Sequence, residues 1–480
     1  MGYPVKIVQF GDGVFLRAFI DWMVERMNRA GRFGGGIAVV KPRPGDFSPA
    51  YAKQGREYSV ALKGILDGKR VETRERVRSI SRLVNPYADY GAYLAEAANP
   101  DLVCVVSNTT ESGIAPSPAD RAEDRPAPSF PGKLTQFLRA RYEAFGGDPG
   151  KGLAIIPCEL IESNAAILRD LVLDHAARWY SDPAFSAWLV DANSWIDSLV
   201  DRIVTGFTEA EKAAILAEEA FEDDLVAVAE PYHILALQAP ESMEALLPLR
   251  ACGLNVVWAP DIAPYRELKV RLLNGSHTLM ALCGLSLGRK TVLECVGDPL
   301  LVGAVRAYQL GETIPTMGQA GAAAAIGKAE AERYLEGVIE RFSNPDLAHK
   351  LEGITSKSVA KFAARVLPTV RGQITMKGKA PVMASFILAA LVDRYTSDAV
   401  LQDEAPAIAW FASRKGAFAD DPQGAMRETL GPAGPWGGPL GTGNCADEAA
   451  RRLARIRALG MAAALREAVA ESRAAEASRE

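Results

Sequence analysis

Short, mostly apolar runs recur along the first half of the chain and alternate with stretches of helical periodicity. The runs occupy residues 5–10, 36–40, 102–106 and 153–156. Continuous apolar strands between helices are typical of a parallel sheet that is covered on both faces. From about residue 260 onward, Ala, Leu, Arg and Glu recur at helical spacing. We therefore predict an α/β domain with a mostly parallel sheet in residues 1–250 and a mostly α-helical domain in residues 251–480.

The balance of charges excludes one class of partner. The chain carries 54 Lys and Arg residues against 59 Asp and Glu residues, a formal net charge of −5. A dedicated nucleic-acid-binding protein would carry a basic excess, so we expect a small-molecule partner. The six cysteines form no CxxC pair, and no uncharged apolar run reaches about 18 residues. These features predict free thiols, no membrane partner and a cytoplasmic location, and they leave both a monomer and a dimer open.

A glycine turn with the sequence Gly-Asp-Gly at 11–13 follows the first apolar run. Such a turn lets the backbone approach a dinucleotide pyrophosphate, which the free N–H groups of the next helix stabilise. Leu16 replaces the usual third glycine, so the motif by itself also fits an ordinary strand-to-helix turn. Lys41 and Arg43 follow the second run, where an acidic residue often binds a ribose 2′-hydroxyl. Lys41 is therefore a candidate cofactor contact, and a basic residue here leaves NADP possible as well as NAD. The alternative is that Lys41 and Arg43 are simply solvated loop residues.

Small polar residues follow the third apolar run. Asn108 and Thr109 stand directly after the segment that ends near residue 107. The carboxyl ends of parallel strands face the cofactor crevice in nucleotide-binding sheets, so these side chains suit ribose or nicotinamide contacts. The alternative is turn formation, which Asn and Ser also favour.

The most informative stretch for catalysis lies at 261–278, where a helix is expected after a proline. At about 100° per residue, Lys269, Asn274 and His277 fall within roughly 140° of one another and can share a face. A lysine beside apolar residues can exchange a proton with a substrate hydroxyl, and an Asn amide can stabilise a developing alkoxide. The spacing of the other histidines matches no metal site, so we expect no metal.

The pattern Lys-x4-Asn-x2-His resembles the mannitol dehydrogenase family, the polyol-specific long-chain dehydrogenases. Within that family, the chain is most similar to the branch that interconverts tagaturonate and altronate. Further matching stretches follow in the order of the family: QFGDGVFLRAF at 9–19, SNTTESGI at 107–114, IIPCELI at 155–161, LVDRIVTG at 199–206, KVRLLNGSHT at 269–278 and RFSNP at 341–345.

The resemblance implies a Rossmann-type first domain, a helical second domain and NAD as the cofactor, with no metal. It implies that Lys269 is the general acid/base, that Asn274 stabilises the oxyanion and that His277 positions the substrate. The cofactor contacts that it implies are Gly11, Gly13 and Phe15, with Asn108, Thr109 and Asp201.

Leu160 departs from the mannitol-type members, which carry an asparagine at this place, two residues after Cys158. This departure favours a keto-hexuronate over a polyol. A uronate also needs a basic partner for its carboxylate, for which Arg371 and Lys379 are candidates. Fructuronate reduction, oxidation of mannitol or another polyol, and a non-catalytic dinucleotide-binding regulator remain the alternatives.

Overall fold

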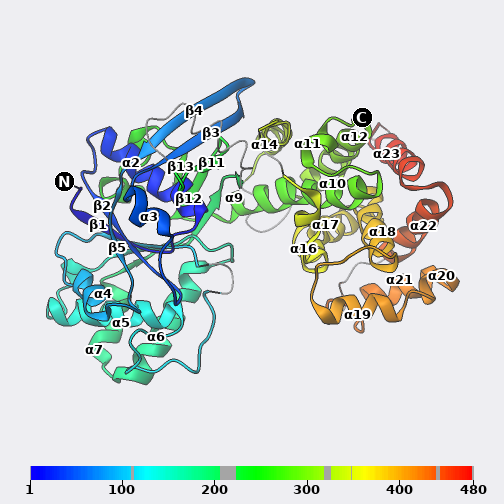
Figure 1. Ribbon diagram of the computed structural model, residues 1–480. Coiled ribbons are helices and arrows are strands. Elements are labelled where there is room, and N and C mark those ends of the chain that lie inside the picture. The colour runs from blue at the N-terminus through cyan, green and yellow to red at the C-terminus, as the bar shows by residue number, and fades with distance from the viewer. Residues whose placement is uncertain are drawn as a thin grey trace. The chain divides into compact units, whose positions relative to one another are not determined.

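The computed structural model describes residues 2–109, 113–205, 223–317, 326–346, 349–438, 440 and 444–477 (Figure 1). It divides into two compact units. The sheet unit comprises Met1–Gly64 and Arg70–Ile262, and the helical unit comprises Ile65–Lys69 and Ala263–Glu480. The predicted fold classes of the two halves are confirmed. Among the described residues, no helix is long and apolar enough to cross a membrane.

The main sheet has the strand order β5-β2-β1-β6-β7-β8, and its described pairings are all parallel. The side chains of β1 alternate between its faces. Val8 and Phe10 belong to the core that includes Tyr93 and Phe137, whereas Ile7 belongs to the core on the other face. The strands are β1 (Val5–Phe10), β2 (Gly36–Val40), β5 (Ile80–Val84), β6 (Cys104–Ser107), β7 (Ala154–Pro157) and β8 (Ser194–Trp195).

Two smaller sheets complete the sheet unit. One has the order β10-β11-β3-β4 and the other β13-β12-β9. Because β13 follows residue 250, the sheet unit extends through Ile262. The strands are β3 (Tyr58–Leu66), β4 (Lys69–Val77), β9 (Ser198–Asp201), β10 (Val204–Thr205), β11 (Ala227–Ala229), β12 (Ile234–Gln238) and β13 (Val256–Ala259), and the helices beyond the first one are α3 (Pro49–Gln54), α4 (Tyr90–Ala97), α5 (Phe130–Ala144), α6 (Asn164–Tyr180) and α7 (Pro183–Asp191).

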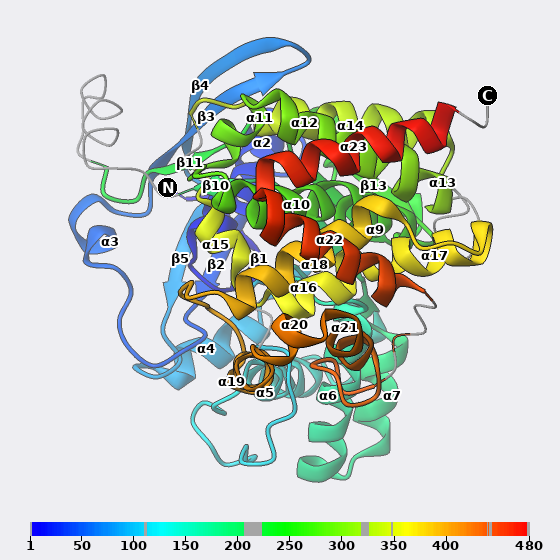
Figure 2. The same ribbon diagram turned by 90° about the vertical axis from the view of Figure 1, so that its right-hand side faces the viewer.

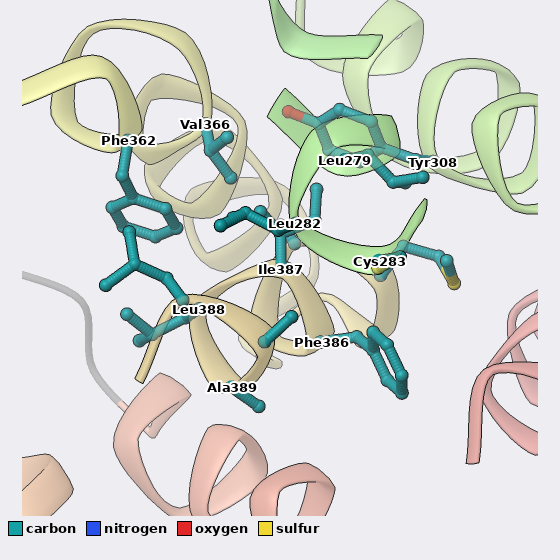
Figure 3. Packing of buried hydrophobic residues seen from close by; sticks show 14 of the residues in the cluster. Leu279, Leu282, Cys283, Tyr308, Phe362, Val366, Phe386, Ile387, Leu388 and Ala389 are labelled. Atoms are coloured by element: carbon teal, nitrogen blue, oxygen red, sulfur yellow. The ribbon is translucent and has the colours of Figure 1, made fainter. Parts of the chain in front are cut away.

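Two almost wholly buried helices, α10 (Asn274–Ser286) and α18 (Val382–Thr396), form the centre of the helical unit. Their apolar side chains interdigitate in one core, which Figure 3 shows around Leu282 and Ile387. The last helices, α22 (Cys445–Leu459) and α23 (Met461–Ala477), pack against α18 and are red in Figure 2. Around them lie α9 (Ala263–Glu267), α11 (Val292–Val296), α12 (Pro299–Tyr308), α13 (Ile314–Met317), α14 (Lys328–Phe342), α15 (Leu351–Thr355), α16 (Ser358–Arg365), α17 (Leu367–Lys377), α19 (Ala405–Ser413), α20 (Ala417–Asp420) and α21 (Pro422–Leu430).

The helix after the glycine turn contains a π-helical turn. It runs as α1 (Val14–Leu16), the π-helical turn η1 (Arg17–Asp21) and α2 (Trp22–Arg29). The wider hydrogen-bonding pattern disturbs the ordinary ladder and leaves carbonyls that need other donors. The Tyr58 hydroxyl donates to the Arg17 carbonyl at 3.1 Å, and Arg202 Nη1 donates to the Ala18 carbonyl at 2.6 Å. Side chains from β3 and from the segment after β9 therefore stabilise the helix that follows the glycine turn.

Asp21 lies at the end of η1, fully buried beside the Tyr58 hydroxyl. That hydroxyl is 2.9 Å from Asp21 Oδ2 and 3.1 Å from the Arg17 carbonyl, but it has only one proton to donate. A protonated Asp21 resolves this shortage, because it donates to Tyr58 and leaves the Tyr58 proton for Arg17. Burial raises the pKa of Asp21 to about 7, in agreement with that arrangement.

Arg141 on α5 donates hydrogen bonds to the loops that lead into strands at the amino end of the sheet. Its side chain is fully buried, and burial lowers its pKa to about 10, so it stays charged at neutral pH. Four backbone carbonyls accept from the guanidinium: Lys151 at 2.7 Å, Ala97 at 2.9 Å, Asn99 at 2.9 Å and Leu102 at 3.2 Å.

We predict that Arg141→Met lowers the free energy of unfolding by about 3 kcal/mol, because it leaves buried carbonyls without donors. Urea unfolding followed by circular dichroism measures this loss. The matched control is Arg178→Met, because Arg178 is 38% exposed on α6 and pairs only one turn away with Asp174. The control should change stability by about 0.5 kcal/mol or less. Equal effects of the two substitutions would contradict the role of Arg141.

We predict that Asp21→Asn stabilises the protein increasingly as pH rises. The native state keeps the proton on Asp21 up to about pH 7, whereas the unfolded chain releases it near pH 4, so wild-type stability from this group is lost as pH rises through that window. Between pH 5 and 8, the advantage of the variant should grow by about 2–3 kcal/mol.

Urea unfolding at several pH values tests the Asp21 prediction, with the exposed Asp170→Asn as control. A pH-independent difference between wild type and Asp21→Asn would refute the protonated state.

Candidate active site

The glycine turn is shaped by close approach on one side and open space on the other. Gly11 has φ +126°, and a Cβ there would lie 3.0 Å from the Asn108 carbonyl oxygen. Its N–H donates to the Val40 carbonyl at 3.1 Å, which ties the turn to the end of β2. A Cβ on Gly13 would meet no described atom within 4 Å, and no described side chain caps the helix that begins there. The uncapped N–H groups beside open space fit a dinucleotide pyrophosphate.

Lys41, the candidate from the second strand, is held by two neighbours. Its Nζ lies 3.2 Å from Asp12 Oδ2 and 5.2 Å from the centre of the Phe47 ring. The backbone N–H of Lys41 donates to the Val84 carbonyl at 2.9 Å, which fixes the place where β2 ends. The charge of Lys41 is thus partly balanced by the middle residue of the glycine turn.

Asn108 and Thr109 follow β6, as predicted, but their polar groups have protein partners. Asn108 Nδ2 donates to the Cys158 carbonyl at 2.8 Å. The N–H and the hydroxyl of Thr109 donate to Glu159 Oε1 at 2.8 and 2.9 Å, and Ser107 Oγ donates to Glu159 Oε2 at 3.0 Å. Burial raises the pKa of Glu159. This buried carboxyl group therefore fixes the loop that is expected to face the cofactor.

The two remaining cofactor candidates also lie in the sheet unit. Phe15 stacks on Phe19 one turn later in the helix, with ring centres 5.0 Å apart. Asp201 is buried on β9, where it pairs with Ile234 of β12. Its neighbour Arg202 supports η1 and lies 4.2 Å from the Trp22 ring centre. Arg202, the residue after Asp201, therefore stabilises the first helix.

Lys269 lies in a second π-helical turn, η5 (Leu268–Leu273), which leads directly into α10. The assumption of α-helical rotation between Lys269 and Asn274 is therefore wrong, because a π-helical turn advances by less than 100° per residue. The buried Gln309 amide supports this turn. Its Nε2 donates to the Arg271 carbonyl at 3.1 Å and the Leu272 carbonyl at 3.2 Å.

Gln309 itself begins a third π-helical turn, η6 (Gln309–Thr313). Its Nε2 also lies 3.0 Å from Ser276 Oγ on α10. One side chain thus connects three elements: the turn that carries Lys269, the helix that carries Asn274 and His277, and its own turn.

His277 is buried against aromatic rings. Its ring stacks on Phe342 at 4.3 Å and contacts His349 edge-on at 4.8 Å, and His277 Nε2 has no hydrogen-bond partner among the described residues. Burial lowers the pKa of His277 well below its usual value, and the charges of His349, Arg365, Arg341 and Lys361 lower it further. A neutral imidazole follows, which can donate or accept a hydrogen bond but does not carry the proton of the reaction at neutral pH.

Three permanent cations, which we call the basic cluster, act on His277: Arg341, Lys361 and Arg365. Arg365 contacts α10 directly, because its Nη1 lies 3.3 Å from Thr278 Oγ1 and 3.5 Å from the Asn274 carbonyl. Three basic side chains therefore lower the pKa of His277, and one of them, Arg365, also contacts α10.

Arg371 and Lys379, the basic candidates from the sequence, are considered by their own contacts. Arg371 Nε donates to the Leu440 carbonyl at 2.9 Å. Lys379 lines a cavity of about 1000 Å³ whose other walls include Glu312 and Asp447. The basic cluster, Gln309 and Glu159 were not found from the sequence. The one available signal was for Glu159, which lies two residues after the end of β7, beside the polar end of β6.

No group of three His, Cys, Asp or Glu side chains with metal-binding geometry occurs in the described part of the chain. The six cysteines are unbridged.

Family models match both halves. The mannitol dehydrogenase Rossmann domain matches residues 5–250, and the mannitol dehydrogenase C-terminal domain matches residues 261–408. The altronate oxidoreductase of Bacillus subtilis (strain 168) is 38% identical, covering 96% of this chain and 95% of the relative. That of Klebsiella pneumoniae (strain 342) is also 38% identical, covering 82% of this chain and 81% of the relative.

Solved structures share the fold. Mannitol 2-dehydrogenase of Pseudomonas fluorescens, in a ternary complex with NAD and D-mannitol, has a TM-score of 0.73 at 22% identity, covering 97% of this chain and 94% of its own. A substrate-free D-sorbitol dehydrogenase has a TM-score of 0.78 at 22% identity, covering 97% and 95%. The matched models and the identity to the curated relatives show that this chain belongs to the mannitol dehydrogenase family.

Proposed function

We propose that this protein is an NAD-dependent oxidoreductase that interconverts tagaturonate and altronate. The observation that carries the proposal is the basic cluster itself: its charges act on His277, and Arg365 Nη1 lies 3.5 Å from the Asn274 carbonyl and 3.3 Å from Thr278 Oγ1. A sugar acid supplies the carboxylate that such a cluster favours, whereas a neutral polyol does not. The curated relatives, named altronate oxidoreductases at 36–39% identity, support the same substrate class.

The glycine turn and the uncapped helix after it are suited to hold the pyrophosphate of the dinucleotide. When bound, the nicotinamide supplies the hydride for the ketone carbon. The Cys158 carbonyl accepts from Asn108 and the buried Glu159 accepts from Thr109, and these hydrogen bonds favour an ordered cofactor site.

Lys269 is the proposed proton donor for the alkoxide that forms during ketone reduction, and the base in the reverse direction. Asn274 donates its side-chain amide to the same oxygen and stabilises its charge. His277 stays neutral and orients the substrate through Nε2, the atom without a described partner. Gln309 maintains the π-helical turn, so that Lys269 and Asn274 keep their relative placement.

We predict that Lys269→Met lowers kcat by about 10³-fold or more, because it removes the proton donor, and leaves the Kd for NADH unchanged. Turnover is followed by NADH oxidation with tagaturonate, and NADH binding by fluorescence titration. The control is Lys328→Met, because Lys328 is 78% exposed on α14. A Lys269→Met enzyme that keeps wild-type turnover would rule out this mechanism.

We predict that Arg365→Met raises KM for tagaturonate by about 10- to 100-fold through loss of a charge-assisted hydrogen bond. Turnover of a neutral ketohexose, measured at high concentration in the same assay, should change much less. Arg306→Met is the matched control, because Arg306 pairs with Glu336 on the surface of the helical unit.

The same assay decides between Arg365 and the other basic candidates. A rise in KM for Arg371→Met or Lys379→Met, with none for Arg365→Met, would move the carboxylate site to those residues. Comparison of tagaturonate, fructuronate and mannitol as substrates tests the named reaction itself. NADH binding without turnover of any of them would favour a regulator.

A further inference from the structure

We propose that Asp12, through its ion pair with Lys41, makes this protein select NAD(H) over NADP(H). In most dinucleotide-binding sheets, the acid that binds the ribose 2′-hydroxyl stands at the end of the second strand. Here that place holds Lys41, and an acid reaches it from the glycine turn instead. The inference rests on the proposed dinucleotide site, but it does not depend on which sugar acid is the substrate.

The structure brings Asp12 to the end of β2 through backbone contacts. The N–H of Gly11 donates to the Val40 carbonyl at 3.1 Å, so the glycine turn lies beside the residue before Lys41. Arg17 Nη1 donates to the Asp12 carbonyl at 2.8 Å and fixes the turn from the helix side. The Asp12 carboxylate then lies 3.2 Å from Lys41 Nζ.

The ion pair reduces the positive charge that Lys41 can present to a ligand. The ammonium is held by the Asp12 carboxylate and the Phe47 ring, and the two charged side chains are only 16% and 23% exposed. A ribose 2′-hydroxyl can donate to the Asp12 carboxylate without disturbing this pair. A 2′-phosphate would bring negative charge against Asp12 and meet an ammonium that is already neutralised, so its binding is disfavoured.

Asp12→Asn tests this arrangement, because it removes the charge and keeps the shape. We expect the Kd for NADPH to fall by about 10- to 100-fold, since Lys41 becomes available to the 2′-phosphate, while the Kd for NADH changes by about threefold or less. Both constants are measured on the full-length protein without substrate, by fluorescence titration of the reduced cofactors. The gain should shrink as salt is added.

Three further variants make the test specific. Asp12→Asn with Lys41→Met should lose the gain in NADPH affinity, because the responsible cation is gone. Asp12→Asn with Arg43→Met should keep it, since Arg43 is an exposed basic residue two positions along the same loop. Asp12→Glu preserves the charge and should keep the preference for NADH.

The proposal is overturned if wild type binds NADPH as tightly as NADH, or if Asp12→Asn leaves the ratio of the two Kd values unchanged. It is also overturned if the Asp12→Asn, Lys41→Met double variant keeps the gain. Circular dichroism confirms that each variant is folded before titration. A protein that binds NADH selectively but turns over no keto-uronate would refute the proposed reaction and leave this inference standing.

Discussion

The π-helical turn that carries Lys269 depends on the Gln309 amide, which donates to the backbone carbonyls of Arg271 and Leu272. A π-helical turn leaves backbone carbonyls that the ordinary ladder would satisfy, and a buried carbonyl without a donor is costly. Gln309 supplies donors in a position where water has no access, because its side chain is fully buried. The irregular turn that holds Lys269 therefore persists because a second segment, η6, stabilises it.

In the sheet unit, different side chains donate hydrogen bonds to the carbonyls of a π-helical turn. In η1, a tyrosine hydroxyl and an arginine guanidinium satisfy the carbonyls of Arg17 and Ala18. Both donors come from segments that are distant in sequence, so the helix after the glycine turn is correctly formed only when β3 and the segment after β9 are in place. In each unit, the candidate functional segment therefore takes its shape only when other segments of that unit have folded around it.

Much of the fold could be predicted from the sequence, because apolar runs and glycine turns are local signals. The strands at 5–10 and 36–40 have the predicted bounds, and β6 and β7 are shifted by only one or two residues. The π-helical turns could not be predicted, since the apolar spacing of Leu268, Leu272 and Leu273 is also compatible with an α-helix. Arg365 and Gln309 gave no local signal either, because their partners lie 33 or more positions away and a surface Arg or Gln looks the same in sequence.

The π-helical turn at Leu268–Leu273 also makes the length of this segment critical. Compared with an α-helix, such a turn accommodates a surplus residue within the same rise. Removal of one apolar residue would let the helix return to regular geometry without breaking it, and secondary structure content would hardly change. The helical residues on either side of the turn would then keep their phase, whereas the positions inside the turn, which include Lys269, would change relative to Asn274 and His277. Chain length, and not only residue identity, thus specifies the spacing between the lysine and its two partners.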